Sequence, residues 1–250
     1  MMLFLTASIV LLLALLFSML GLGGAMLYVP LLHALGYDFK SIAIPTGLLL
    51  NGITVVSASV VYLRAGMVDL KGAIPLVIAA AAGAPLGAFL TETVPTETLI
   101  LLFAGCMVFA GGLMLRDSAK PDKERLLPLK TRMLWMSLGG IGIGIVSGLL
   151  GIGGGFLFVP MMMALGYPVK QAAATSAFVV IFPSFSGVAG HVAGGHFHWP
   201  LMAAATVAVI VGSHIGARLM KEKMKAAWIK KMFAGVLLAV SVKLFLKVLL

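Results

Sequence analysis

Residues 149–167 read LLGIGGGFLFVPMMMALGY, with five glycines and one proline inside an otherwise apolar stretch. Glycine weakens a helix by about 1 kcal/mol per residue relative to alanine. The run therefore predicts an interruption between two helical pieces at 151–155. Close helix packing explains glycines spaced four apart, as at Gly140, Gly144 and Gly148, but it needs no consecutive run. A phosphate-binding loop is excluded because no strand precedes the glycines and no Gly-Lys-Ser/Thr follows them.

The composition indicates an integral membrane protein. Of the 250 residues, 61% are hydrophobic and only 10% are charged, and the mean hydropathy is +1.14. Apolar runs of about 20 residues, enough to cross a bilayer as helix, recur along the chain. We therefore expect an all-α, multi-pass protein of the inner (plasma) membrane, with the lipid bilayer as its solvent. The net charge of +10 is better explained by basic cytoplasmic loops than by nucleic-acid binding.

The glycine motif occurs twice. A shift of 130 residues aligns LGLGGAMLYVPLLHALGYDFKSIA (20–43) with LGIGGGFLFVPMMMALGYPVKQAA (150–173), and 13 of 24 positions are identical. The similarity continues along the chain with one residue of slippage, and such internal duplication is common among membrane transporters. The sequence predicts one membrane domain built from two repeats, 1–116 and 131–250, joined by a charged cytoplasmic linker at 117–130.

Each repeat contains one glycine-broken segment and three cleaner apolar ones. The broken segments cover about 1–35 and 133–165, and the clean ones are 41–63, 72–91, 97–115, 170–190, 200–219 and 226–249. If every segment crossed the membrane, 10 Lys and Arg would lie inside and 8 outside. If each broken segment returns to the side it entered from, 15 lie inside and only Lys40, Lys243 and Lys247 lie outside. Because cytoplasmic loops collect basic residues, we predict inverted repeats, with eight plain spans as the alternative.

The breaks predict a binding site for an anion. Irregular backbone within hydrocarbon is tolerated only where it is buried in protein or lines a cavity. The half-helix after each break starts with unpaired N–H groups and about half a positive charge, which favours an anion. Hydroxyl and amide groups on the next helix complete the site, although they could instead bond neighbouring helix carbonyls. The predicted substrate-binding residues are Gly23, Gly24, Ala25, Thr46, Asn51, Gly153, Gly154, Gly155, Thr175 and Ser176.

A doubled motif in these residues resembles a known family. The pattern is Gly-x-Gly-Gly-(Gly/Ala), Val-Pro, Leu-Gly-Tyr and Ala-x-x-(Thr/Ser), and it resembles the TauE/SafE family of membrane permeases over essentially the whole chain. The resemblance implies a duplicated permease that moves sulfite, organosulfonates and similar anions, often outward. One departure is Ala25, which stands where the second repeat has Gly155. We therefore expect unequal half-sites, with the stronger one after Gly151.

The sequence gives little support for ion-coupled transport or for a metal site. Every acidic residue lies outside the centres of the spans, so a midmembrane carboxylate relay is not expected. His33, His191 and His214 are the titratable candidates near segment ends. His191, His196 and His198 could form a metal site, but no Cys or carboxylate lies close in sequence. We expect no cofactor, no metal and no catalytic residue.

Two other functional classes remain as alternatives to a permease that works by alternating access. A non-transporting assembly subunit would use the glycine faces for packing alone. A membrane-embedded serine hydrolase could draw on Ser184, Ser186 and His191, but no Gly-x-Ser-x-Gly turn frames these residues. The sequence leaves the carried anion, the direction of transport and the oligomeric state open, and a homodimer is one of the assemblies it allows.

Overall fold

The chain is all-helical over the residues that the computed structural model describes, which are 2–118, 126–191 and 199–249. The helices of the first repeat are α1 (Met2–Met19), α2 (Ala25–Ala34), the π-helical turn η1 (Phe39–Ala43), α3 (Ile44–Arg64), α4 (Leu70–Thr91) and α5 (Thr96–Ser118). Those of the second are α6 (Leu129–Leu150), α7 (Gly155–Ala164), α8 (Val169–His191), α9 (Trp199–Lys223) and α10 (Ala226–Leu249). The predicted broken and clean segments correspond to these elements in order.

Several helices are long and apolar enough to span a membrane. Within the described residues, six qualify by length and composition: 39–64, 70–91, 96–116, 129–150, 169–189 and 202–223. Large apolar side chains on them face outward, including Ile78 (65% exposed) and Phe89 (78% exposed). Exposed apolar side chains over so many helices are stable only against lipid. The protein is therefore a multi-pass membrane protein, as its composition predicts.

Both glycine runs interrupt a helix, which confirms the predicted breaks. Gly151, with a φ of 69°, ends α6, and Gly154, with a φ of 75°, precedes α7. In the first repeat Gly21 and Gly23 take φ values of 68° and 70° between α1 and α2. A side chain other than glycine disfavours this left-handed backbone.

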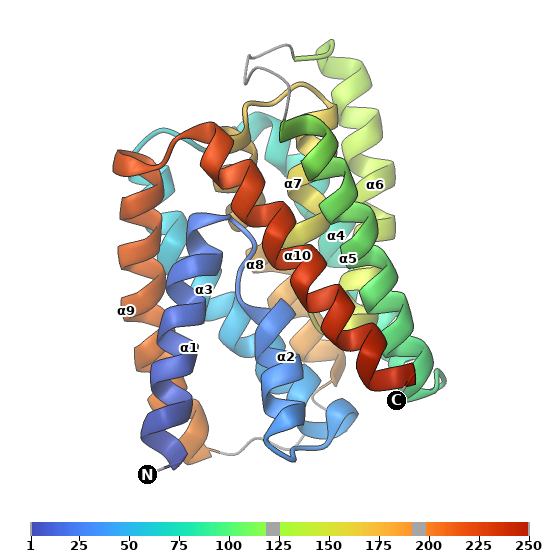
Figure 1. The fold of residues 1–250 in the computed structure, drawn as a ribbon. Helices are drawn as coiled ribbons and strands as arrows, with labels where there is room; N and C mark the ends of the chain where they lie inside the picture. The colour runs from blue at the N-terminus through green and yellow to red at the C-terminus, as the bar shows by residue number, and fades with distance from the viewer. Residues whose placement is uncertain (1, 119–125, 192–198, 250) are drawn as a thin grey trace.

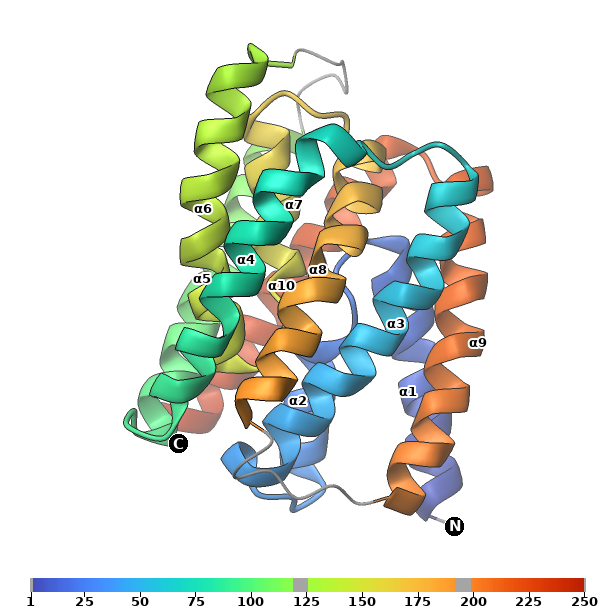
Figure 2. The ribbon, with the colours of Figure 1, turned by 180° about the vertical axis from the view of Figure 1, so that it is seen from behind.

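The two broken segments enter the bundle from opposite ends. Figure 1 shows α1 running inward from the end that carries the N-terminus and α2 returning towards that end. In the same view α6 runs inward from the other end and α7 returns towards it. Behind these segments α3 and α8 pack side by side (Figure 2). The breaks themselves thus lie inside the bundle and away from both ends.

The first helix of each repeat packs on a helix of the other repeat. Helix α6 lies against α4, and α1 lies against α9. A Cβ atom at Gly144 would lie 2.5 Å from the carbonyl oxygen of Ala80, and one at Gly83 would lie 2.6 Å from that of Ile141. Glycine permits this close approach. Gly212 and Gly216 similarly meet the α1 backbone at Leu11 and Leu15, so the repeats interlock.

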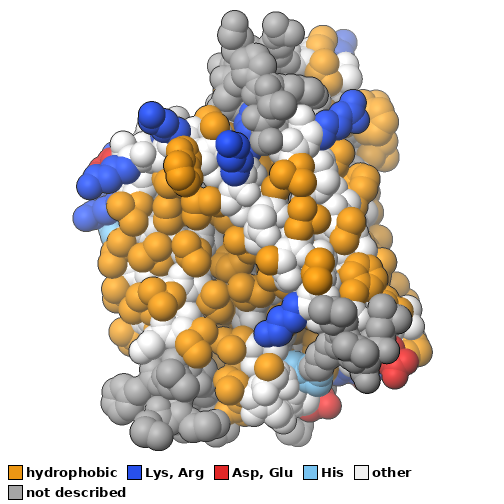
Figure 3. Space-filling model, viewed as in Figure 1, with side chains coloured by type: hydrophobic (Ala, Val, Ile, Leu, Met, Phe, Trp, Pro, Cys, Tyr) orange, Lys and Arg blue, Asp and Glu red, His pale blue; other side chains and the backbone are white. Residues whose placement is uncertain are grey.

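Basic side chains gather at the end where α6 begins. Figure 3 shows Lys and Arg mainly along the upper edge of the molecule, above a broad hydrophobic band. Arg64, Arg218 and Lys221 line one small pocket there, and the Lys170 ammonium donates to the Lys221 carbonyl oxygen at 3.4 Å. Lys40, by contrast, donates to the Glu92 carbonyl oxygen, between η1 and the turn that joins α4 to α5. This distribution agrees with a cytoplasmic location of the α6 end.

Candidate functional site

Each glycine break lies in close contact with residues of the other repeat. A Cβ atom at Gly155 would lie 2.5 Å from the carbonyl oxygen of Leu22, so the start of α7 contacts the loop before α2. A Cβ at Gly21 would collide with the backbone of Ala173 in α8. These glycines therefore serve close approach between the repeats in addition to breaking the helices.

Asn51, in the middle of α3, bonds to the start of α2. Its side-chain oxygen accepts hydrogen bonds from the amides of Gly24 at 2.6 Å and Ala25 at 3.0 Å. Its side-chain nitrogen donates to the Ser184 hydroxyl on α8 at 2.9 Å, and Asn51 is fully buried. The α2 amides thus have an internal, uncharged acceptor in the position where an anion would lie.

The start of α7 has no such acceptor. No described residue accepts a hydrogen bond from the amides of Gly154 and Gly155, which are the counterparts of Gly24 and Ala25, although both glycines are buried. A Cβ at Gly153 would meet Val180 at 3.0 Å and would also touch the side-chain nitrogen of Asn51. Buried backbone amides without partners are rare in folded proteins. The second half-site therefore has donors for which the described part of the chain supplies no acceptor.

A buried hydroxyl without a partner lies beside the α7 start. The Ser147 side chain, near the end of α6, is 0% exposed, and its hydroxyl oxygen has no hydrogen-bond partner among the described residues. Its Cβ would lie 3.3 Å from a Cβ at Gly154. An unpaired buried hydroxyl costs free energy and adds a hydrogen-bond donor next to the unpaired amides. Sequence comparison of the repeats misses Ser147 because Phe17 is its aligned residue.

The three hydroxyl residues predicted for the site have different partners. Ser176 donates to the carbonyl oxygen of Gly155 at 3.3 Å, in the first turn of α7. Thr46 is buried, and its hydroxyl has no partner within the described part of the chain. Thr175 instead accepts a hydrogen bond from the backbone amide of Asp69 at 3.0 Å, at the α3–α4 connection. The structure therefore groups Ser176 with the α7 break and ties Thr175 to the basic end.

The π-helical turn changes which residues of the two repeats correspond. Along α3 and α8 the alternation of buried and exposed side chains repeats at an offset of 129 residues: Leu49, Val56 and Val60 match Phe178, Phe185 and Ala189. The alignment before α3 has an offset of 130, and η1 absorbs the extra residue because a π turn holds one residue more than an α turn. Thr46 therefore corresponds to Thr175, rather than to Ser176 as the constant shift predicts. Val180 takes the place of Asn51.

A polar cluster that sequence analysis missed joins the repeats at the basic end. The Tyr167 hydroxyl donates to the Asp69 carboxylate at 2.7 Å, and Arg132 donates to the Tyr167 oxygen at 2.8 Å. Arg132 also pairs with Asp69 at 3.5 Å and lies over the Tyr167 ring. Burial, followed by the hydrogen bond to Asp69, raises the pKa of the Tyr167 phenol, so the phenol stays protonated and keeps donating. The cluster holds the α3–α4 turn against α6 and the α7–α8 turn.

Among the described residues, those suggested for other chemistry do not assemble into a second site. Ser184 is engaged by Asn51, and the Ser186 hydroxyl has no partner among the described residues. The side chain of His191 and all of His196 and His198 lie outside the described residues. Among the described residues no three His, Cys, Asp or Glu lie close enough together to hold a metal ion. The His33 Nδ1 lies 3.4 Å from the Tyr37 carbonyl oxygen.

Comparison with known proteins agrees with this architecture. The family described as sulfite exporter TauE/SafE matches residues 6–244. A probable membrane transporter protein of Bacillus subtilis, YunE, is 29% identical over 91% of this chain and 91% of its own length. A probable membrane transporter protein of Methanocaldococcus jannaschii, MJ0441, is 23% identical over 88% of this chain and 86% of its own.

A eukaryotic relative shares a shorter region. The Arabidopsis thaliana protein named sulfite exporter TauE/SafE family protein 3 is 35% identical over 42% of this chain, which is 23% of that protein. No solved structure matches the chain. The geometry of the site therefore comes from this chain alone.

Proposed function

This chain belongs to the sulfite exporter TauE/SafE family, and we propose that it transports a small sulfur-containing anion, such as sulfite or an organosulfonate, across the plasma membrane. The observation that carries the proposal is the pair of unpaired amides at the start of α7, in the interior of the bundle beside the unpaired Ser147 hydroxyl. Amides at a helix start bind oxyanions without any cationic side chain. The donors around the breaks are amides and hydroxyls, with no Lys or Arg among them.

The two half-sites have different roles in this proposal. At α2 the Asn51 oxygen already accepts from both amides, so an anion must displace it to bind there. At α7 the anion meets free donors: the amides of Gly154 and Gly155 and the hydroxyl of Ser147. The Asn51 side-chain nitrogen, beside Gly153, adds a donor from the other repeat. Gly23, Gly24, Ala25 and Thr46 then form the α2 half of the site, Ser176 shapes the α7 half, and Thr175 acts at the basic end.

Alternating access follows from repeats that cross the membrane in opposite directions. The site lies between the breaks, and each end of the bundle closes or opens in turn. In this mechanism the cluster of Asp69, Arg132 and Tyr167 supports closure of the basic end, because it joins the two repeats there. Thr175 contributes to the same closure, since it holds the amide of Asp69. Opening that end requires these hydrogen bonds to break, which couples access to the relative position of the two repeats.

Flux measurement in proteoliposomes tests the transport function. Purified protein is reconstituted, and uptake of labelled sulfite is measured alone and in competition with sulfate, methanesulfonate and chloride. We expect saturable uptake that sulfonates inhibit and chloride does not. Absence of saturable flux for every anion, with protein that still elutes as a folded species, would reject the transporter function in favour of an assembly subunit. A function as an assembly subunit also predicts that Thr175→Val changes only the stability of the protein.

A further inference from the structure

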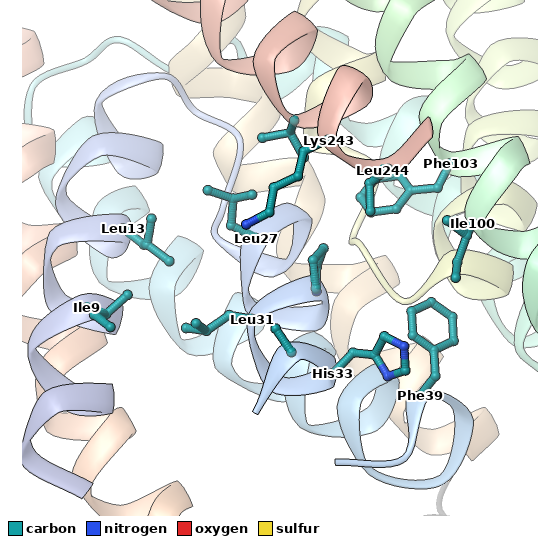
Figure 4. A pocket seen from close by; sticks show the side chains of 13 residues that line it. Ile9, Leu13, Leu27, Leu31, His33, Phe39, Ile100, Phe103, Lys243 and Leu244 are labelled. Carbon is teal, nitrogen blue, oxygen red and sulfur yellow. The ribbon is translucent and has the colours of Figure 1, made fainter. Parts of the chain in front are cut away.

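An apolar cavity of about 390 Å³ opens between α1, α2, α5 and α10, and none of the described residues that line it belongs to either glycine break. Its walls are aliphatic and aromatic side chains from all four helices and η1, among them Ile9, Leu31, Phe39 and Phe103. Figure 4 shows these side chains surrounding an open space between the ribbons. Its volume falls in the usual range of ligand pockets, about 300–1,000 Å³.

The corresponding place in the second repeat is closely packed between α6 and α7. The offset of 130 residues aligns Ile9 with Gly139 and Leu31 with Met161. A Cβ atom at Gly139 would lie 2.5 Å from the Met161 sulfur, so α6 and α7 are in close contact there. In the first repeat the aligned residues, Ile9 and Leu31, instead both line the cavity.

Among the described residues that line this cavity, Lys243 is the one Lys or Arg. In Figure 4 the Lys243 side chain extends from α10 across the cavity towards Leu27, while His33 lies at the lower side beside Phe39. Lys243 is exposed, and its ammonium group makes no ion pair with any described residue. An ammonium among apolar side chains of a membrane protein is costly unless an anion or water reaches it. The pairing of an apolar cavity with one free cation matches a ligand that has an aliphatic chain and an anionic head.

We propose that this cavity binds an anionic phospholipid of the leaflet opposite the basic end, with an acyl chain between α1, α2 and α10 and the phosphate at Lys243. The source is the bilayer itself, since the cavity opens on a face with a broad hydrophobic band (Figure 3). Lysine on a helix of a membrane protein reaches towards the headgroup region with its ammonium, and an anionic headgroup there satisfies it. The site is separate from the proposed anion site and requires no transport activity.

Native mass spectrometry on the purified full chain tests the proposal. The protein is titrated with phosphatidylglycerol and with phosphatidylcholine of the same acyl chains, and with decanesulfonate as a soluble amphiphile. We expect phosphatidylglycerol to bind more tightly than phosphatidylcholine. Lys243→Gln should lower the phosphatidylglycerol affinity about fivefold, the effect of one basic residue near an anionic headgroup. Leu31→Trp, which fills the cavity, should lower binding of both phospholipids.

The matched control is Lys40→Gln. Lys40 lies towards the same end of the molecule as the cavity but outside it, with its ammonium on the Glu92 carbonyl oxygen. This variant should bind phosphatidylglycerol like the wild type. Equal affinity for the two phospholipids, or equal loss in both lysine variants, would overturn the proposal. Tight binding of decanesulfonate without phosphatidylglycerol binding would assign the cavity to a soluble amphiphile and overturn the lipid assignment.

Discussion

The side-chain oxygen of Asn51 lies 2.6 Å from the amide nitrogen of Gly24, so a neutral group of α3 occupies the helix start at which an anion would otherwise bind. At the other break Val180 stands in the corresponding place and accepts nothing. The two half-sites therefore differ through one pair of residues, Asn51 and Val180. Replacing each of these residues by the type that stands at the other position tests the proposed site directly.

Removing the internal acceptor should destabilise the protein. Asn51→Val leaves the amides of Gly24 and Ala25 buried without a partner, and we expect a loss of about 1–3 kcal/mol in the free energy of unfolding. Thermal unfolding in detergent measures the change. Saturating sulfite should restore part of the stability, because an anion can then bind at α2. Val56→Ala, at an outward-facing position of α3, serves as the control. Unchanged stability of Asn51→Val would contradict the role of Asn51.

Adding an acceptor to the second half-site should block the anion. Val180→Asn places an amide oxygen near the free amides of α7, and we expect saturable uptake to fall at least about tenfold, equivalent to 1.4 kcal/mol of lost binding. Val180→Leu adds a side chain of similar size without an acceptor. If both variants lose flux equally, the loss comes from packing, and the proposed use of the α7 amides is wrong.

The glycine contacts between α4 and α6 should be sensitive to one methyl group. Gly148→Ala directs a Cβ into the backbone of Ala84, and overpacking of this kind costs about 1–3 kcal/mol. Gly142→Ala provides the matched control on the same helix, since no atom lies within 4 Å of the added Cβ. The midpoint of thermal unfolding should fall for Gly148→Ala and hold for Gly142→Ala. Equal midpoints would show that α4 and α6 are not closely packed at this position.

The cluster of Asp69, Arg132 and Tyr167 at the basic end should contribute stability that depends on pH. Tyr167→Phe removes the hydrogen bonds to Asp69 and Arg132, and we expect a loss of about 1–2 kcal/mol at neutral pH. Because the folded protein raises the pKa of Tyr167, its contribution is complete below about pH 10, the ordinary value for tyrosine, and declines as the pH rises further. Stability curves of wild type and variant should therefore converge at high pH. Parallel curves up to the alkaline limit would contradict this origin of the stability.

Opposite orientation of the repeats predicts opposite accessibility at matched positions. Lys40→Cys and Lys170→Cys, each in a Cys106→Ser background, should react with a membrane-impermeant maleimide from different sides of intact cells or oriented vesicles. Lys170 should be reached from the cytoplasmic side. Reaction of both positions from one side would reject the inverted arrangement and favour eight plain spans.

The sequence by itself determined the membrane class, the duplication and the positions of both breaks. These features follow from local composition: consecutive glycines cannot hold a helix within 151–155, and apolar runs of spanning length need no distant partner to become helical in lipid. Gly23, Gly24 and Gly153 to Gly155 therefore lie where the repeat predicts.

Only the tertiary structure decided how the two halves differ. Whether Asn51 would cap α2, whether Ser147 would lie beside Gly154, and whether Asp69 would meet Tyr167 and Arg132 all depend on contacts between residues distant in the chain. The single extra residue in the π-helical turn was also invisible to a constant shift, and it pairs Asn51 with Val180. A buried hydrogen bond depends on the angles and distances between packed helices, and no local pattern in the sequence encodes those values.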